Sequence, residues 1–220
     1  MKREILITSD GSSTIHLPEW DENYHSKHGA IQEAKHVFIK SGFSLFKNEN
    51  ISILEIGFGT GLNCFITFLE AIKSNVSVNY AGVEAYPVNN LEIDAMNYVT
   101  QLNAKNFENQ FLEMHRCNWE QKNEISSNFH LTKRKQFFSD ISDNESFDLI
   151  YFDAFGARVQ PELWTVDMFK IMYNALKKNG ILVTYSAKGS VRRALLEVGF
   201  LVEKLPGPPG KREMLRAIKK

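Results

Sequence analysis

The sequence predicts an α/β protein with a Rossmann-like fold, in which helices cover both faces of a mostly parallel sheet. Apolar strand-like segments alternate with helix-like segments along most of the chain, and this alternation is typical of such sheets. A glycine-rich turn joins the first of these strands to the next helix, and acidic residues follow several strands. At 220 residues the chain fits one domain, with residues 1–50 as an N-terminal extension and helix and residues 51–220 as the core.

The first elements lead up to the glycine-rich turn. Residues 1–28 predict a short β-rich or irregular extension. Gly29–Lys40 has the apolar spacing of a helix, which Ser41-Gly42 ends. Ile51–Ile56 is an apolar strand, and Leu62–Lys73 follows it as a helix with apolar residues on most faces.

The middle of the chain continues the alternation. Val76–Val83 is predicted as a strand and Pro87–Leu102 as a helix, because proline is favoured in a first helical turn. The stretch 106–134 predicts a helix over its first half, followed by a strand near Phe129–Phe138. Phe147–Phe152 reads F-D-L-I-Y-F, which is typical of a buried strand.

The C-terminal part adds two helices and three strands. Glu162–Leu176 is predicted as a helix, Gly180–Ser186 as a strand, and Gly189–Val198 as a helix that Gly199 ends. Two last strands lie near Phe200–Leu205 and Glu213–Ile218. The turn-forming loop P-G-P-P-G-K-R between them predicts an antiparallel hairpin.

Composition excludes several classes of protein. With 43% hydrophobic and 12% aromatic residues the chain is too apolar to be disordered. No apolar run approaches the roughly 18 residues that span a bilayer, and the N-terminus lacks the apolar core of a signal peptide. We therefore expect a cytoplasmic protein without a membrane partner.

Metal and hydrolase chemistry are not expected either. The six histidines form no H-x-x-x-H pattern, and His25 and His28 are the only close pair. Cys64 and Cys117 lie far apart without a C-x-x-C motif, so we expect buried packing instead of redox chemistry. No G-x-S-x-G motif is present.

The glycine-rich turn is the strongest sign of a ligand. The segment 54–63 reads L-E-I-G-F-G-T-G-L-N, with G-x-G-x-G spacing instead of the G-x-G-x-x-G of dinucleotide folds or the P-loop motif. An acidic residue before the turn would repel a pyrophosphate and favour a cationic ligand. The segment therefore indicates S-adenosylmethionine, although a turn without a ligand is the plain alternative. The predicted cofactor-binding residues here are Glu55, Gly57, Phe58, Gly59, Thr60, Gly61 and Asn63.

Acidic residues after three later strands complete the predicted site. Glu84 follows Gly61 by 23 residues, where a carboxylate accepts hydrogen bonds from ribose hydroxyls in related folds. Asp140 is predicted to accept a hydrogen bond from the adenine amino group, although Asp143 is close and helix capping competes for such a residue. Asp153 directly follows a buried strand, where it can orient an amine nucleophile as the catalytic residue, although an aspartate that caps the loop is the alternative.

Charge is balanced overall but unevenly distributed. The chain has 26 basic and 26 acidic residues, yet nine Lys or Arg and only three Glu lie from Lys188 onward. This excess predicts a surface that faces a polyanion, or else a chance cluster of solvated charges.

Several longer segments resemble one family closely. They are residues 21–33 (D-E-N-Y-H-S-K-H-G-A-I-Q-E), 57–63, 84–87 (E-A-Y-P), 152–165 (F-D-A-F followed by P-E-L-W-T), 186–200 and 207–215 (ending G-K-R-E-M-L). In order and spacing the chain resembles the methyltransferase domain that completes 5-methylaminomethyl-2-thiouridine at the wobble position of bacterial tRNAs. In many bacteria that domain is fused to an FAD-dependent oxidase. One departure is Gly156-Ala157, where the family commonly has alanine and proline, which would loosen the loop beside Asp153.

The resemblance implies N-methylation of the 5-aminomethyl group of a wobble (2-thio)uridine, with S-adenosylmethionine as the cofactor and the tRNA anticodon stem-loop as the partner. It implies Tyr24, Phe155 and Trp164 as the wall of the base pocket. It implies phosphate contacts by Arg192, Arg193, Lys211 and Arg212, although Arg193 could instead form an internal salt bridge and Trp164 could fill the core. The chain ends at Lys220, so no FAD domain is expected in it.

Two rival functions remain. One is a polyamine synthase, which has a similar cleft and an aspartate after the fourth strand. Segment 154–160 contains no acid, however, and the basic C-terminus would repel a polycation. The other is a non-catalytic RNA-binding module that retains the fold.

Overall fold

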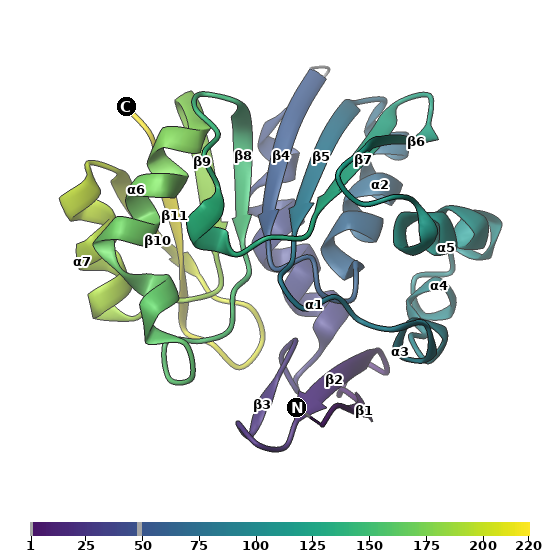
Figure 1. Cartoon of the computed structure of the whole chain (residues 1–220). Helices are drawn as coiled ribbons and strands as arrows, with labels where there is room; N and C mark the ends of the chain where they lie inside the picture. Colours follow the sequence, from purple (N-terminus) through teal and green to yellow (C-terminus); the bar gives the residue numbers. More distant parts are fainter. Residues whose placement is uncertain (1, 48–49) are drawn as a thin grey trace.

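In the computed structural model, which describes residues 2–47 and 50–220, strand–helix alternation builds one large sheet and one small sheet. The large sheet has the strand order β10-β11-β9-β8-β4-β5-β7-β6 (Figure 1). Strands β9, β8, β4, β5 and β7 are mutually parallel, and antiparallel strands flank them on both sides. The predicted α/β fold with a C-terminal antiparallel hairpin is confirmed.

Each core strand alternates its side chains between two apolar layers. Along β4 (Asn50–Ile56), Ile53 faces one layer while Leu54 and Ile56 face the other. The first layer contains α2 (Leu62–Ser74), and the second contains α6 (Val166–Ala175) and α7 (Gly189–Val198). Because both faces are buried, the carboxyl edge of the parallel strands is the place where polar side chains meet.

The remaining strands of the large sheet have these bounds: β5 Ser77–Val83, β6 Lys122–Ser126, β7 Phe129–Arg134, β8 Phe147–Phe152, β9 Leu176–Thr184, β10 Leu201–Pro206 and β11 Glu213–Ile218. The predicted strands at 147–152 and 213–218 match β8 and β11. Strand β6, which pairs antiparallel with β7, was not predicted. The strand predicted near Phe129–Phe138 ends earlier, and Phe138–Asp140 forms a short 3₁₀ turn instead.

The N-terminal extension folds into a sheet of its own. Strands β1 (Glu4–Ile7), β2 (Ser13–Leu17) and β3 (Glu22–Asn23) pair antiparallel. Helix α1 (Ala30–Ala34) continues into a π-helical turn at Lys35–Lys40, so the predicted helix over 29–40 is one helical segment with a looser second half. The small sheet lies at the carboxyl edge of the large one (Figure 1).

The single helix predicted over Pro87–Leu102 is wrong. The segment instead forms α3 (Asn90–Asp94) and α4 (Tyr98–Gln101), followed by α5 (Glu108–Arg116). The break has a tertiary cause, because the Asn97 backbone N–H donates to Ser13 Oγ (3.0 Å) and the Asn97 side chain accepts from the Ser13 N–H (2.8 Å). Contacts to the small sheet thus replace the hydrogen bonds of a continuous helix.

The helix predicted over Glu162–Leu176 is also divided. Pro161–Trp164 is a 3₁₀ turn, and α6 begins only after Thr165. Thr165 has extended backbone angles, and its Oγ1 accepts from the Met168 N–H (3.3 Å), so it caps α6. Leu176 is already the first residue of β9.

Candidate active site

The glycine loop after β4 makes a tight turn at the carboxyl edge of the sheet. Gly57, Gly59 and Gly61 have φ values of +89°, +47° and +71°, a region that residues with a Cβ rarely adopt. A Cβ on Gly57 would lie 2.8 Å from the carbonyl oxygen of Asp153. The N–H groups of Gly57 and Phe58 donate to the Val83 carbonyl (3.1 and 3.0 Å). The loop is therefore fixed against both neighbouring strands.

Glu84, at the end of β5, holds the tip of this loop. Its Oε2 accepts from the Gly59 N–H (3.0 Å) and its Oε1 accepts from the Tyr86 N–H (2.9 Å). An ionised carboxylate has about four acceptor positions, so Glu84 can still accept hydrogen bonds from hydroxyls of a ligand. Glu84 lines the cavity described below together with Phe58, Gly59 and Thr60.

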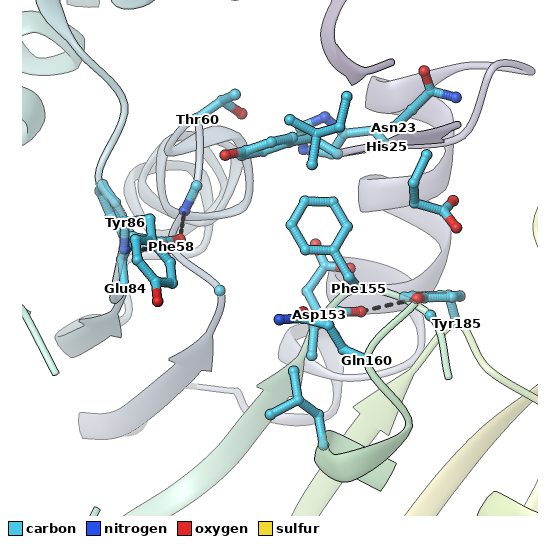
Figure 2. A pocket seen from close by; sticks show the side chains of 18 of the residues that line it. Asn23, His25, Phe58, Thr60, Glu84, Tyr86, Asp153, Phe155, Gln160 and Tyr185 are labelled. Atoms are coloured by element: carbon cyan, nitrogen blue, oxygen red, sulfur yellow. Dashed lines mark hydrogen bonds between the residues drawn. The ribbon is translucent and has the colours of Figure 1, made fainter. Parts of the chain in front are cut away.

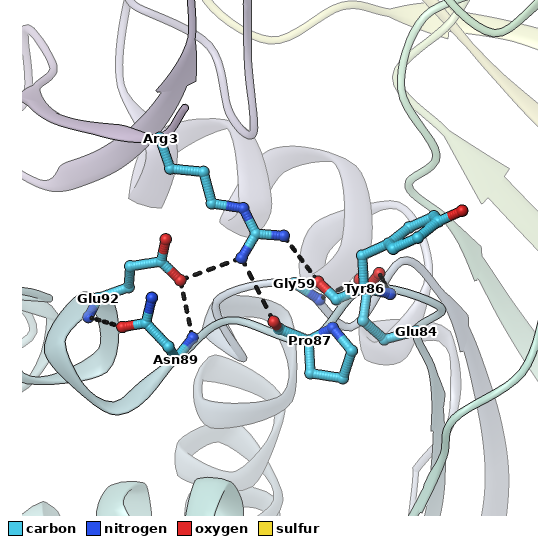
Figure 3. A network of polar contacts seen from close by, with 7 residues as sticks. All are labelled: Arg3, Gly59, Glu84, Tyr86, Pro87, Asn89 and Glu92. Carbon is cyan, nitrogen blue, oxygen red and sulfur yellow. Dashed lines mark hydrogen bonds and ion pairs between the residues drawn. The ribbon is translucent and has the colours of Figure 1, made fainter. Parts of the chain in front are cut away.

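Arg3 joins the small sheet to the loop that follows Glu84 (Figure 3). Its guanidinium donates to the carbonyl oxygens of Tyr86 (2.8 Å) and Pro87 (3.3 Å) and pairs with Glu92 (3.0 Å). Glu92 also accepts from the Asn89 N–H (2.7 Å), and Asn89 caps α3 in return. The ion pair is largely buried, with side-chain exposures of 19% for Arg3 and 13% for Glu92. Arg3 thus adds to the Ser13–Asn97 contacts that hold the N-terminal sheet in place.

Asp153 follows β8 and belongs to a hydrogen-bonded network of buried polar groups. Asn63 on α2 donates one amide hydrogen to Asp153 Oδ2 (2.8 Å) and the other to Glu55 Oε1 (2.9 Å). Burial raises the pKa of Asp153 to about 7, the charge of Glu33 adds to this rise, and Asn63 and Lys211 oppose it. Burial raises the pKa of Glu55 well above its usual range, which favours its neutral form. Asp153, with a pKa of about 7, can change charge near neutral pH.

Aromatic rings form the opposite wall. The ring of Phe155 meets Tyr24 (centroids 5.1 Å apart) and Trp20 (5.7 Å) edge to face. Figure 2 shows Asp153 and Phe155 between the glycine loop and Tyr185. Burial raises the pKa of Tyr24 to about 12, which keeps its hydroxyl neutral.

These groups surround one cavity of about 1170 Å³, which contains room for two ligands side by side. Ten of the residues predicted from the sequence line it: Tyr24, Gly57, Phe58, Gly59, Thr60, Asn63, Glu84, Asp153, Phe155 and Lys211. Residues predicted to bind the cofactor and residues predicted to bind the base thus line the same cavity.

Other predicted site residues lie outside the cavity lining. Glu55 and Gly61 stand behind it, where Glu55 supports Asn63 and Gly61 caps α2. Trp164 is buried, and its Nε1–H donates to the Phe155 carbonyl (2.8 Å), so it supports the loop instead of facing a ligand. Asp140 is exposed, while its neighbours Phe138 and Ser139 do line the cavity.

The basic residues divide into two groups. Arg193 and Arg212 are exposed and Arg192 is half-buried, and all three lie away from the cavity lining. Lys211 lies in the cavity wall, where its Nζ pairs with Glu33 (2.6 Å). This internal pairing differs from the phosphate contact that the sequence predicted for Lys211.

Sequence reasoning missed much of the wall, including the polar residues Arg3, His25, Glu33 and Tyr185. His25 and Glu33 belong to the motif at residues 21–33, so the signal was present although no role was assigned to them. Burial lowers the pKa of His25 to about 4, which leaves it neutral. Arg3 and Tyr185 carry no local pattern that would have identified them.

The comparison with known families decides the class of the protein. Residues 94–220 match the profile of a family described as S-adenosyl-L-methionine-dependent methyltransferases, and this match covers more than half of the chain. The chain belongs to this family. The predicted cofactor, S-adenosylmethionine, is confirmed with it.

Curated relatives resemble nearly the whole chain. The "tRNA 5-methylaminomethyl-2-thiouridine biosynthesis bifunctional protein MnmC" of Leptospira interrogans is 31% identical over 96% of this chain. The protein of the same name from Marinomonas sp. is 29% identical over 90% of it. The chain spans about a third of the length of these relatives (34% and 31%).

Solved structures agree with this family. The crystal structure of MnmC2 from Aquifex aeolicus is 26% identical, covers all of this chain and 70% of its own, and superposes with a TM-score of 0.81. Spermidine synthase from Thermotoga maritima covers 94% of this chain and 68% of its own at 13% identity and a TM-score of 0.53, which shows a shared fold only.

The residues of the cavity fit the cofactor of this methyltransferase. Gly57 and Gly59 present backbone without side chains to the cavity, and Glu84 offers acceptors for hydroxyl groups. Asn63 Oδ1 is buried without a hydrogen-bond partner in the described part of the chain, so it can accept from the ammonium group of a ligand. Residues 2–47 and 50–220 contain no cluster of His, Cys, Asp and Glu that could hold a metal ion. No helix in the same ranges is long and apolar enough to cross a bilayer.

Proposed function

We propose that this methyltransferase methylates the amine of a 5-aminomethyl group on the wobble (2-thio)uridine of a tRNA, which gives 5-methylaminomethyl-(2-thio)uridine. The observation that carries the proposal is the position of Asp153, a carboxylate with a raised pKa in the wall between the glycine loop and an aromatic pocket. The names of the relatives from Leptospira and Marinomonas point to the same substrate.

We propose the following assignment for the cofactor. The backbone of Gly57 and Gly59 contacts the methionine part, Glu84 accepts hydrogen bonds from the ribose, and Phe138 and Ser139 border the adenine. Asp140 stays a prediction for the adenine amino group, which it could reach only from the exposed side. When bound, S-adenosylmethionine supplies a methyl group on a positively charged sulfur.

Asp153 prepares the acceptor amine. The nitrogen must present a neutral lone pair, and Asp153 accepts a hydrogen bond from one of its N–H groups and so orients that lone pair. As positive charge develops on the nitrogen, the carboxylate stabilises it. A carboxyl with a pKa of about 7 can also take the released proton, because its basicity is much greater than that of an ordinary aspartate.

The aromatic residues hold the base. Tyr24 and Phe155 offer ring faces and edges on which an extruded uracil can stack, with a contribution of about 1–3 kcal/mol per stacked base. Trp164 acts through its hydrogen bond to the Phe155 carbonyl. Arg192, Arg193 and Arg212 are proposed as contacts to phosphates of the anticodon stem-loop outside the cavity.

The decisive experiment uses tRNA from cells that accumulate the 5-aminomethyl precursor. Incubation with labelled S-adenosylmethionine should add one methyl group to the wobble nucleoside, as measured by mass spectrometry of the digested tRNA. Asp153→Ala should reduce the rate at least a hundredfold, since both alignment and proton acceptance are lost. Failure to methylate this tRNA, together with turnover of another amine, would contradict the proposal.

A salt titration tests the proposed phosphate contacts. The affinity for tRNA should fall steeply with salt, and Arg212→Ala should reduce the slope of log K against log salt by about 0.7 to 1. An unchanged slope would remove Arg212 from the interface.

Aminopropyl transfer is the second candidate, because the glutamates that line the cavity include Glu22, Glu33 and Glu162, which could hold a polyamine. Two of them are already paired, Glu22 with Arg158 (3.0 Å) and Glu33 with Lys211 (2.6 Å), which reduces the attraction for a polycation. Incubation with putrescine and decarboxylated S-adenosylmethionine should give no product. Spermidine formation would favour this second candidate.

A further inference from the structure

The cavity contains a second acidic side chain whose charge is balanced by a lysine. Glu33 on α1 is only 10% exposed in its side chain. Its Oε2 accepts from the Ser26 N–H (2.9 Å) and its Oε1 accepts from Lys211 Nζ (2.6 Å). Glu33, Lys211 and Asp153 line the same cavity. The pair therefore belongs to the acceptor side of the site and not to the outer surface.

Lys211 is held in place by an aromatic ring as well as by Glu33. Its Nζ lies 3.9 Å from the centroid of the Tyr185 ring, a favourable cation–π geometry. The Tyr185 hydroxyl donates to the carbonyl of Ala154 (2.8 Å), the residue next to Asp153. Contacts from two distant segments thus hold the lysine, and one of them, at Tyr185, is hydrogen-bonded to the Asp153 loop.

The groups that face Asp153 can be divided by charge. Asn63 from α2 is a neutral donor. Burial raises the pKa of Glu55 from β4 and of Tyr185 after β9 well above the usual range of each, which favours their neutral forms. The charged neighbours are Glu33 and Lys211, which shift the pKa of Asp153 in opposite directions.

We propose that Glu33 and Lys211 are positioning residues for methyl transfer, and that the balance of their two charges decides whether Asp153 meets the acceptor amine as a carboxylate. Loss of Glu33 leaves an unbalanced cation near Asp153, which favours its ionised form. Loss of Lys211 leaves an unbalanced anion, which favours the protonated form. The identity of the acceptor amine rests on the proposed function. The electrostatic part of the proposal, that Glu33 and Lys211 control the protonation of Asp153, does not.

The electrostatic part is tested without any substrate, by ¹³C NMR titration of protein labelled at the aspartate carboxyl carbons. The Asp153 resonance is assigned by its absence in Asp153→Asn. Relative to the unchanged protein, Glu33→Gln should lower the Asp153 midpoint by about one pH unit, and Lys211→Met should raise it by a similar amount. Shifts in the same direction, or no shift in either variant, would overturn the proposal.

Two further variants serve as controls. Lys211→Arg keeps the charge and should retain the Asp153 titration midpoint of the unchanged protein. The contrast with Lys211→Met therefore shows whether the charge of Lys211 sets this midpoint, even if Glu33→Gln does not fold. Lys204→Met removes another lysine–glutamate pair of the C-terminal hairpin, Lys204 with Glu213 (3.0 Å), at an exposed site. It should leave the Asp153 midpoint unchanged, and a shift as large as that of Lys211→Met would overturn the local role.

The catalytic part is tested by the pH dependence of kcat on aminomethyl tRNA. The acid limb should move to lower pH in Glu33→Gln and to higher pH in Lys211→Met, while the Kd for S-adenosylmethionine stays within about twofold. Displaced NMR midpoints with an unmoved kcat profile would overturn the positioning role. If the unchanged protein methylates no such tRNA, the proposed function fails, while the NMR result still decides the electrostatic part.

Discussion

Asp153→Asn should stabilise the protein while it abolishes methyl transfer. The pKa of Asp153 rises from 3.8 to about 7 on folding, which corresponds to about 4 kcal/mol of unfavourable free energy for the ionised form above neutral pH. The side chain is partly accessible to solvent, which screens part of this cost, so we expect about 2 kcal/mol. Asparagine retains an oxygen that can accept the hydrogen bond from Asn63, so this contact survives.

The sign of the pH dependence follows from the direction of the pKa change. Between about pH 4 and about pH 7 the folded state keeps a proton that the unfolded chain has released. The free energy of unfolding of the unchanged protein therefore falls as the pH rises through this range. In Asp153→Asn this contribution to the pH dependence is absent. The difference in the free energy of unfolding should be about 2 kcal/mol at about pH 8 and less than half of this at about pH 5.

Urea unfolding followed by circular dichroism measures this difference at both pH values. Asp140→Asn is a matched control, because it removes an exposed carboxylate and should change the free energy of unfolding by less than about 0.5 kcal/mol. The reasoning is refuted if Asp153→Asn is no more stable than the unchanged protein at about pH 8, or if the difference does not vary with pH.

Three further predictions concern the cofactor side. Gly82→Ala places a Cβ 2.4 Å from Cδ2 of Phe58, so this ring must move. The affinity for S-adenosylmethionine, measured by calorimetry, should therefore fall at least tenfold. An unchanged Kd would show that the Phe58 ring can move without affecting cofactor binding. Glu84→Ala removes the acceptor of the Gly59 N–H and should also weaken cofactor binding at least tenfold, about 1.4 kcal/mol, with less than threefold loss speaking against its role. Arg3→Ala should increase hydrogen exchange in residues 4–23 and 85–92 together, and protection equal to that of the unchanged protein would mean that other contacts hold the small sheet.

The fold was predictable where local signals agree. The apolar run Phe147–Phe152 and the helix Gly189–Val198, which Gly199 ends in a left-handed conformation, match the structure residue for residue. The segment Pro87–Leu102 was not predictable, because its break depends on contacts between Asn97 and Ser13, which lie 84 residues apart. A pattern within one segment contains no information about such a partner.

The same limit applies to the site. The glycine loop and Glu84 are recognisable because their geometry follows from neighbouring residues and a fixed spacing. The Glu33–Lys211 pair joins residues 178 positions apart, so a reading of each segment by itself could at most mark Glu33 and Lys211 as members of two motifs. Trp164 was predicted as part of the base pocket with core packing as the alternative, and its depth in the core depends on α6 packing.

The Arg3 contacts have a consequence for how freely this protein can change over evolution. Two of the three partners of its guanidinium are main-chain carbonyls, of Tyr86 and Pro87, which every amino acid possesses. Side chains in that loop can therefore diversify, for instance to suit a different environment around the adenosine, without releasing the N-terminal strands. Glu92 is the partner that supplies the counter-charge through its side chain. We expect sequence drift to be tolerated at Tyr86 and to be coupled between positions 3 and 92.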